Sequence, residues 1–143
     1  MRNIQSFNRY IINIHYEIGG KIEMHVISLI VKNEFGVMQR IMGEFTRNKI
    51  NVETIVVGKC ELPGKARMVL SVIGKEAVET ALSRLNRLQD VYCAQIVEED
   101  GQSAYALITT TNGLVGLIGK SADVEEIIER TKPERYVKTL SAL

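Results

Sequence analysis

The sequence is poor in the residues that most often catalyse reactions or hold metal ions. It has two cysteines, two histidines and no tryptophan among 143 residues. Cys60 and Cys93 are far apart and form no CxxC motif, so we expect two reduced thiols, one or both buried on strands. His15 and His25 have no Cys, Asp or Glu at a spacing that would complete a metal site. The sequence therefore predicts no metal centre.

The chain also lacks a strong charge of either sign and a long apolar run. Its formal net charge of +1 gives no basic surface for nucleic acid or an anionic membrane. No apolar run approaches the roughly 18 residues of a membrane-spanning helix. The opening residues, MRNIQSFNRYIINIHYEIGG, have neither the apolar core nor the cleavage site of a signal peptide. We therefore expect a cytoplasmic chain with no nucleic acid and no membrane as partner.

Strand and helix patterns alternate between residues 25 and 98. HVISLIVK is a β-branched run typical of a strand that is buried on both faces. In the next segment Met38, Ile41, Met42 and Phe45 share one helical face. LPGK is a strong turn signal between two apolar runs and predicts a β-hairpin. The predicted elements are strand 25–32, helix 37–48, hairpin 50–73, a helix with an apolar stripe from Ala77 to Leu88, and strand 90–97.

This order, βαββαβ, predicts an α+β fold of the ferredoxin-like type over residues 24–98. Each β-α-β crossover should be right-handed, which places both helices on one face of an antiparallel sheet. The other face also carries apolar residues and needs cover. We therefore expect a second domain, an oligomer, or both.

A smaller unit is predicted for residues 103–143, after the polar break EEDGQS. Two strands flank Asn112-Gly113, a pair that tolerates positive φ in a hairpin turn. A helix follows, with Ser121 as its N-cap and Pro133 just past its end, and a last strand completes the unit. The order ββαβ is that of the first unit without its opening strand and helix, so we interpret it as a truncated second copy. Residues 1–23 fit neither unit and are interpreted as an N-terminal extension, which could form a strand that turns at Gly19-Gly20.

The junction between the first strand and the first helix is a candidate binding site. The first four N–H groups of a helix lack partners and carry the positive end of its dipole, which favours an anion by about 0.3 to 1 kcal/mol. Gly36 would let a carboxylate approach the backbone, and Asn33 can donate to a carboxylate or accept from an ammonium. Asn51 begins the next strand, near the far end of the helix. A second copy could bring its Asn51 to this site, and an amino acid held this way would bridge two subunits.

The same residues have simpler interpretations. Asn33 could make an Asx turn or cap the helix, Gly36 could supply only an unusual dihedral angle, and Asn51 could be one exposed strand residue. Arg67 is a second candidate, although a lone strand arginine is more often a solvated edge charge. We interpret three methionines as residues that fill the core: Met38, Met42 and Met68.

No catalytic constellation emerges. No Ser, Cys or Thr has a histidine beside it, and there is no phosphate loop and no pair of carboxylates with distinct environments. The aromatic residues that stack RNA bases on this fold are missing from HVISLIVK and ARMVLSVI. A small enzyme such as an acyl phosphatase would need Arg40 and Asn33 to converge on a phosphate, and nothing else in the sequence supports that. We expect a chain that is not an enzyme.

Three stretches resemble the ACT domain of the regulatory (small) subunit of acetohydroxyacid synthase, also called acetolactate synthase. They are HVISLIVKNEFGVMQRIMGEFTRNKINVETIVVG, PGKARMVLSVIG and LNRLQDVYCAQIVEE, and the likeness covers residues 24 to about 98. Its most specific parts are Asn33-x-x-Gly36-Val37 with Arg40 following, FTR leading into INVE, and Arg67-Met68. The resemblance implies a non-catalytic chain that binds the catalytic subunit, raises its activity and confers feedback inhibition by valine or a related branched-chain amino acid.

The resemblance also implies where the effector binds and what the chain assembles with. In that family the effector lies between two ACT domains, so a homodimer or higher oligomer is implied. The cofactors, thiamine diphosphate, FAD and Mg, are expected in the catalytic partner and not in this chain. The positions that match the family's effector site are Asn33, Gly36, Val37 and Asn51, with Met38 alongside.

The likeness weakens over the second unit. AYALITTTNGLVGLIGKSADVEEIIERTKPERYVKTLSAL resembles the latter part of the family's C-terminal domain, without the opening strand and helix and without the usual Arg and Gly near the end. Since that domain helps to engage the catalytic subunit, the resemblance implies effector binding more strongly than activation. The alternative is a freestanding ACT module that senses an amino acid and acts on another enzyme or regulator.

Overall fold

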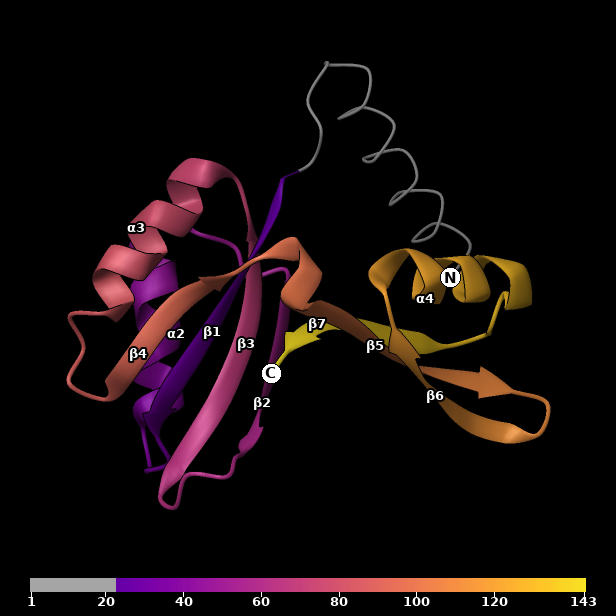
Figure 1. Ribbon diagram of the computed structural model, residues 1–143, viewed down its shortest axis with the longest axis horizontal. Coiled ribbons are helices and arrows are strands. Elements are labelled where there is room, and N and C mark those ends of the chain that lie inside the picture. The colour runs from indigo at the N-terminus through magenta and orange to yellow at the C-terminus, as the bar shows by residue number, and fades with distance from the viewer. Residues whose placement is uncertain (1–22) are drawn as a thin grey trace.

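The computed structural model describes residues 23–143, so the strand predicted before Gly19-Gly20 lies outside the described residues. Two units follow one another along the chain (Figure 1). The first contains β1 (Met24–Lys32), α2 (Val37–Arg47), β2 (Thr54–Lys59), β3 (Lys65–Ile73), α3 (Lys75–Leu85) and β4 (Val91–Val97). The second contains the short helix η1 (Glu99–Gly101), β5 (Gln102–Thr110), β6 (Gly113–Gly119), α4 (Ser121–Thr131) and β7 (Tyr136–Ala142).

The first unit is the βαββαβ fold that the sequence predicted. Its sheet has the order β2-β3-β1-β4, and every neighbouring pair is antiparallel. Both helices cover the same face of this sheet (Figure 1). The hairpin turn lies where LPGK indicated, because Gly64 has φ 73° and the Lys65 N–H donates to the Leu62 carbonyl at 3.2 Å.

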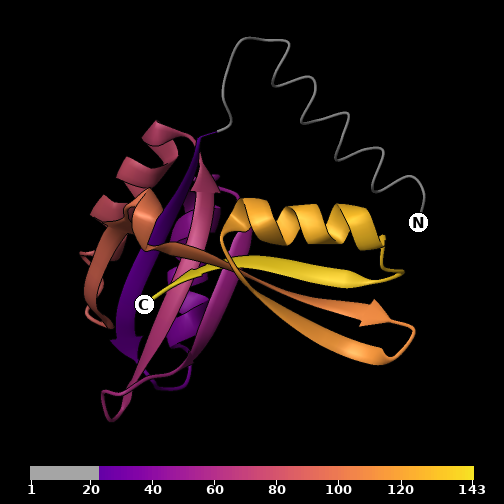
Figure 2. The same ribbon diagram turned by 45° about the vertical axis from the view of Figure 1, so that its right-hand side comes forward.

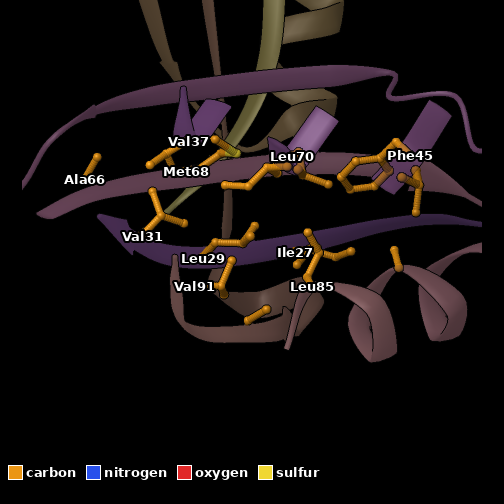
Figure 3. Packing of buried hydrophobic residues seen from close by; sticks show 14 of the residues in the cluster. Ile27, Leu29, Val31, Val37, Phe45, Ala66, Met68, Leu70, Leu85 and Val91 are labelled. Carbon is orange, nitrogen blue, oxygen red and sulfur yellow. The ribbon is translucent and has the colours of Figure 1, made fainter. Parts of the chain in front are cut away.

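The main core lies between this sheet and the two helices. Ile27 and Leu29 of β1 and Leu70 of β3 meet Ile41 of α2 and Leu85 of α3, and all five side chains are 0% exposed. Figure 3 shows how the side chains from the central strands fill this space. Since burying one such side chain contributes about 1.5 to 3 kcal/mol, this layer holds the first unit together.

The packing face of α2 differs from the predicted stripe by one position. Val37, Ile41 and Phe45 are the buried residues of the helix, whereas Met38 is 37% exposed. Residues four apart lie almost above one another on a helix, so Val37 sets a face that turns Met38 toward solvent. The interpretation of Met38 as core filler was therefore wrong, while Met68 is buried as expected.

The second unit has a three-stranded sheet, β6-β5-β7, with α4 on one face (Figure 2). The predicted ββαβ order is confirmed. In this sheet β5 pairs with β6 and β7 and is antiparallel to both, which is the position that β1 has between β3 and β4. Compared with the first unit, the second therefore lacks the first helix and the second strand, and not the opening strand.

Two local predictions in the second unit need correction. The hairpin loop is Thr111-Asn112, and only Gly113 has a positive φ, of 113°. Ser121 is the first residue of α4 and makes no capping bond; its hydroxyl lies 3.1 Å from the Lys138 ammonium, which donates to it. The loop position follows from the register that pairs Thr110 with Gly113, and the Ser121 difference comes from a contact with β7, which local sequence does not report.

The second unit supplies cover for the helix-free face of the first sheet. Val26 of β1 and Val69 of β3 are buried in one cluster with Ala104, Leu140 and Ala142 of the second unit. The strand β7 lies against β2 and β3 on this face. The expectation of a covering second domain is confirmed.

Neither described thiol is buried. Cys93 on β4 is exposed, and Cys60 just after β2 is half-buried; both are free. The prediction of a buried strand cysteine was wrong, because Cys93 lies on a sheet edge whose outer surface the second unit leaves open. No helix within residues 23–143 has the length and apolar character needed to cross a membrane.

Candidate functional site

The junction before α2 is built around Gly36. This residue is the N-cap of α2, with φ 82° and ψ −9°, a left-handed conformation that favours glycine. A β-carbon placed there would lie 2.9 Å from Nη1 of Arg40. The dihedral angle by itself accounts for the glycine. It also leaves the backbone at the start of the helix uncovered by any side chain at this position.

The N-terminus of α2 has no side-chain cap, because no side chain of residues 23–143 bonds to its free N–H groups. The interpretation of Asn33 as a helix cap is therefore wrong. Its backbone N–H donates to the Gly64 carbonyl at 3.0 Å, which fixes the loop while the residue remains exposed. An exposed asparagine thus stands next to uncapped N–H groups at the positive end of a helix.

Arg40 lies one turn into α2 and is held by an ion pair. Its Nε lies 2.6 Å from Oδ2 of Asp90, the residue before β4. This hydrogen bond raises the pKa of the Arg40 guanidinium and lowers the pKa of the Asp90 carboxyl. The positive charge of Arg40 is thereby kept close to Gly36. Asp90 could not be selected from the sequence, since nothing local connects residues 50 positions apart.

The structure separates Asn51 from this junction. Asn51 lies in the connection before β2, which begins at Thr54 and not at residue 50 as predicted, and its side chain donates to Glu53 Oε1 at 2.9 Å. The 11 residues of α2 separate it from Gly36, and a helix of that length spans about 16 Å. Asn33 and Asn51 therefore lie at opposite ends of one helix and do not converge within one chain.

Apolar surface lies at the same junction. Val37 is 2% exposed and belongs to the core, whereas Met38 is 37% exposed. Phe35 is fully exposed and was not singled out from the sequence, although an aromatic residue inside a loop that carries Asn and Gly is a usable signal. The exposed apolar residues of this region are thus Phe35 and Met38.

Arg67 has a structural role. It lies on β3, which is an interior strand between β2 and β1, so the interpretation as an edge charge was wrong. Its guanidinium donates to both oxygens of Glu61, at 2.8 and 2.7 Å. This pairing holds the pKa of Glu61 at about 2. The salt bridge ties the β2–β3 turn to the sheet.

The remaining surface offers little for catalysis. A shallow hollow beside α2 is lined by Gln39, Arg40, Gly43, Arg47 and Leu88. No group of three or more His, Cys, Asp or Glu residues in the range 23–143 is placed to hold a metal ion. The best-formed site is therefore the uncapped helix start at Gly36.

Comparison with known proteins defines the class of the first unit. A family model described as an AHAS small subunit-like ACT domain matches residues 27–93. The first unit is therefore an ACT domain. A curated relative, the acetolactate synthase small subunit of Bacillus subtilis, is 31% identical over 138 residues, covering 76% of this chain and 80% of the relative. The chain belongs to the acetolactate synthase small-subunit family, whose members are non-catalytic regulatory subunits.

Other relatives match a shorter part of their length. The probable acetolactate synthase small subunit of Methanothermobacter thermautotrophicus is 44% identical over 70 residues, which is 48% of this chain and 42% of that protein. The match to the probable small subunit of Archaeoglobus fulgidus covers 54% of that protein, so the chain spans about half the length of these two relatives. The small subunit of Thermotoga maritima has the same fold, with a TM-score of 0.70 at 21% identity, covering 85% of this chain and 97% of that one.

Proposed function

We propose that this chain acts as a regulatory subunit of acetolactate synthase and binds valine or a related branched-chain amino acid between two ACT domains. The observation that carries the proposal is the uncapped start of α2 at Gly36, next to the exposed Asn33. A free helix N-terminus of this kind stabilises a carboxylate.

The chemistry of the junction suits a free amino acid. The carboxylate would accept bonds from the N–H groups of the first turn of α2, with Arg40 nearby to strengthen the positive potential. Asparagine oxygens can accept from the ammonium group. The exposed surfaces of Phe35 and Met38 can cover a branched aliphatic side chain. Each part of the amino acid therefore has a partner near the junction.

Asn51 completes such a site only from a second copy. It lies at the opposite end of α2 from Gly36 in its own chain, so its amide would reach the effector across a dimer interface. The proposed site residues are then Asn33, Gly36, Val37 and Met38 of one chain and Asn51 of the other. An effector bound in this way would change the relative population of dimer arrangements, which gives it a route to a partner enzyme.

The partner in this proposal is the catalytic subunit of acetolactate synthase, which would carry thiamine diphosphate, FAD and Mg. This chain would add no cofactor and would change activity through coupling between sites. Such coupling is typically about 1 to 3 kcal/mol, or about 5-fold to 150-fold. The proposed location is the cytoplasm.

A second candidate is a freestanding ACT module that senses an amino acid and regulates another protein. The shortened second unit favours it, since that unit lacks one helix and one strand relative to the first. Co-purification with the catalytic subunit, and valine-dependent activity of the mixture, separate the two candidates.

The binding proposal is tested by calorimetric titration of the purified chain with valine, leucine and isoleucine, with lysine as the control ligand. We expect saturable binding of a branched-chain amino acid, lost in both Asn33→Ala and Asn51→Ala. Asn112→Ala, an exposed asparagine in the second unit, is the matched control and should bind normally. Absence of binding to every ligand would refute the proposal.

Mixing the two inactive variants tests the bridge between subunits. In a mixed dimer one interface site receives Asn33 and Asn51 intact, while the other site receives neither. Binding should therefore reappear on mixing Asn33→Ala with Asn51→Ala, with up to one site per mixed dimer. If mixing restores nothing although the chains exchange, the site does not span two copies.

A further inference from the structure

The strand β6 is an edge that lacks the neighbour its position calls for. In the first sheet, β3 is flanked by β1 and β2. The strand β6 occupies the position of β3 in the second sheet, but within residues 23–143 it pairs with β5 alone. Figure 2 shows this strand and its hairpin turn extending away from the first unit. In the part of the chain that the structure describes, the shortened second unit therefore leaves one edge of β6 unpaired.

This edge lacks charged residues and proline, two features that normally protect an edge strand. Its sequence, GLVGLIG, contains no charge and no proline. Leu114 is 69% exposed and Ile118 is 79% exposed. By contrast, the edge strand β2 ends at Lys59, and β7 contains Lys138. The composition of β6 is typical of an interior strand that is paired on both sides.

The backbone groups available for pairing can be assigned from the ladder. The Thr109 N–H donates toward β7, to the Arg135 carbonyl at 3.1 Å. Since successive residues of a strand alternate in direction, Thr110 and Ile108 bond to their partners Gly113 and Val115 on β6. The residues between those partners direct their N–H and C=O groups outward: Leu114, Gly116 and Ile118.

The sequence of β6 is self-complementary about Gly116. If two copies run antiparallel with their Gly116 residues opposite each other, every large side chain faces a large one and every glycine faces a glycine. The pairs are Gly113 with Gly119, Leu114 with Ile118, Val115 with Leu117, and Gly116 with its own copy. We propose that β6 pairs in this register with β6 of a second copy of this chain, forming a continuous six-stranded sheet.

The side chains around β6 suit this arrangement. A β-carbon at Gly116 would meet the ring of Tyr105 at 3.6 Å, so the aromatic ring covers the glycine at the centre of the pairing. Leu114 and Ile118 lie on the same face as Tyr105, opposite α4. In the paired sheet Leu114 of one copy packs beside Ile118 of the other, and the lack of charge on β6 means that no like charges meet.

The size of this contact determines how strong it can be. A standard stable interface uses about 20 to 30 residues on each side, and β6 supplies 7 residues. Pairing through β6 alone is therefore concentration-dependent. When another contact already holds copies together, the second contact becomes effectively intramolecular and is strongly favoured.

A symmetric cysteine tests the register. Gly116→Cys is made in a chain whose native thiols are removed by Cys60→Ser and Cys93→Ser. Opposed residues at a hydrogen-bonded antiparallel position have Cα atoms about 5.5 Å apart, within the range of a disulfide. Mild oxidation should convert the folded variant largely into a covalent dimer on a non-reducing gel. Leu114→Cys is the matched control: its two copies would lie about 14 Å apart along the strands and should stay uncrosslinked.

Charge pairs across the symmetry axis give an independent readout. Leu114→Lys with Ile118→Glu places opposite charges face to face and should keep association, measured by sedimentation velocity over a concentration series. Leu114→Lys with Ile118→Lys places like charges together and should abolish it. The proposal is overturned if the folded Gly116→Cys chain does not crosslink, or if Leu114→Cys crosslinks equally well. Amino-acid titration of the same variants reports the effector site separately, so the two proposals fail independently.

Discussion

Gly36→Asp separates the proposed binding role of the helix start from its structural role. Gly36 has φ 82°, and a residue with a β-carbon in that conformation costs about 1 to 2 kcal/mol. The new carboxylate at the helix N-terminus returns about 0.3 to 1 kcal/mol through the dipole. The net loss of about 0 to 2 kcal/mol is small beside a typical stability of about 5 to 15 kcal/mol, so the variant should fold.

The effect on effector affinity should be much larger. The aspartate would stand where the effector carboxylate is proposed to bind. Two negative charges about 4 Å apart repel by about 4 kcal/mol at an effective dielectric constant of about 20. This corresponds to roughly a thousandfold loss of affinity. The β-carbon itself would meet only the Arg40 guanidinium, at 2.9 Å from Nη1, and the same contact arises in Gly36→Ala.

Calorimetric titration and thermal unfolding of the same samples provide the assay. Gly36→Ala is the matched control, because it has the β-carbon and the strained dihedral angle without the charge. We expect Gly36→Ala to keep most of the effector affinity of the unmodified chain. The melting temperatures of Gly36→Ala and Gly36→Asp should be similar. Binding by Gly36→Asp within threefold of the unmodified chain would refute the assignment of the carboxylate to this helix start.

Three further predictions concern the core and the ion pairs. The Leu70 side chain is 0% exposed in the main core, so Leu70→Ala should lower the free energy of unfolding, measured by urea titration, by about 2 to 5 kcal/mol. The control is Ile73→Ala on the same strand, where the side chain is 41% exposed; it should lower the free energy of unfolding by less than half of that amount. Arg67 lowers the pKa of Glu61 from 4.5 to about 2, so the contribution of this ion pair to folding stability is present above pH 4.5 and is lost as the pH falls toward 2. The difference in urea midpoint between the unmodified chain and Glu61→Gln should therefore shrink between pH 4.5 and pH 2. A difference that stays constant over this range would contradict the prediction. Arg40→Gln should weaken effector binding about 2-fold to 5-fold by removing a positive charge near Gly36, whereas Asp90→Asn, which frees that charge, should not weaken it.

Most of the first unit could be predicted because its signals are local. The helical period of α2, the LPGK turn and the β-branched strands each depend on neighbours in the sequence, and the structure places these elements within a few residues of the predicted bounds. The family resemblance over the same residues was confirmed for the same reason. The N-cap prediction for Ser121 was wrong because a residue distant in sequence decided the outcome: the Ser121 hydroxyl accepts from Lys138.

The candidate site shows the same division. Asn33, Gly36 and Val37 could be selected from a short motif at the start of a helix. The partner of Arg40, Asp90, could not, because the two are 50 residues apart and meet only after β4 has paired with β1. Arg67 was misjudged because its position inside the sheet depends on the strand order and not on the strand itself.

The sequence by itself determined the element order, the ACT-type first unit and the glycine at the start of α2, since periodicity and turn chemistry act over a few residues. Only the tertiary structure decided that β5 takes the place of an opening strand and that β6 is left as an open edge. Strand order is set by which surfaces can be buried together, here the face of β5 under α4 and the helix-free face of the first sheet under β7. That choice involves residues far apart in the chain, and no local pattern encodes it.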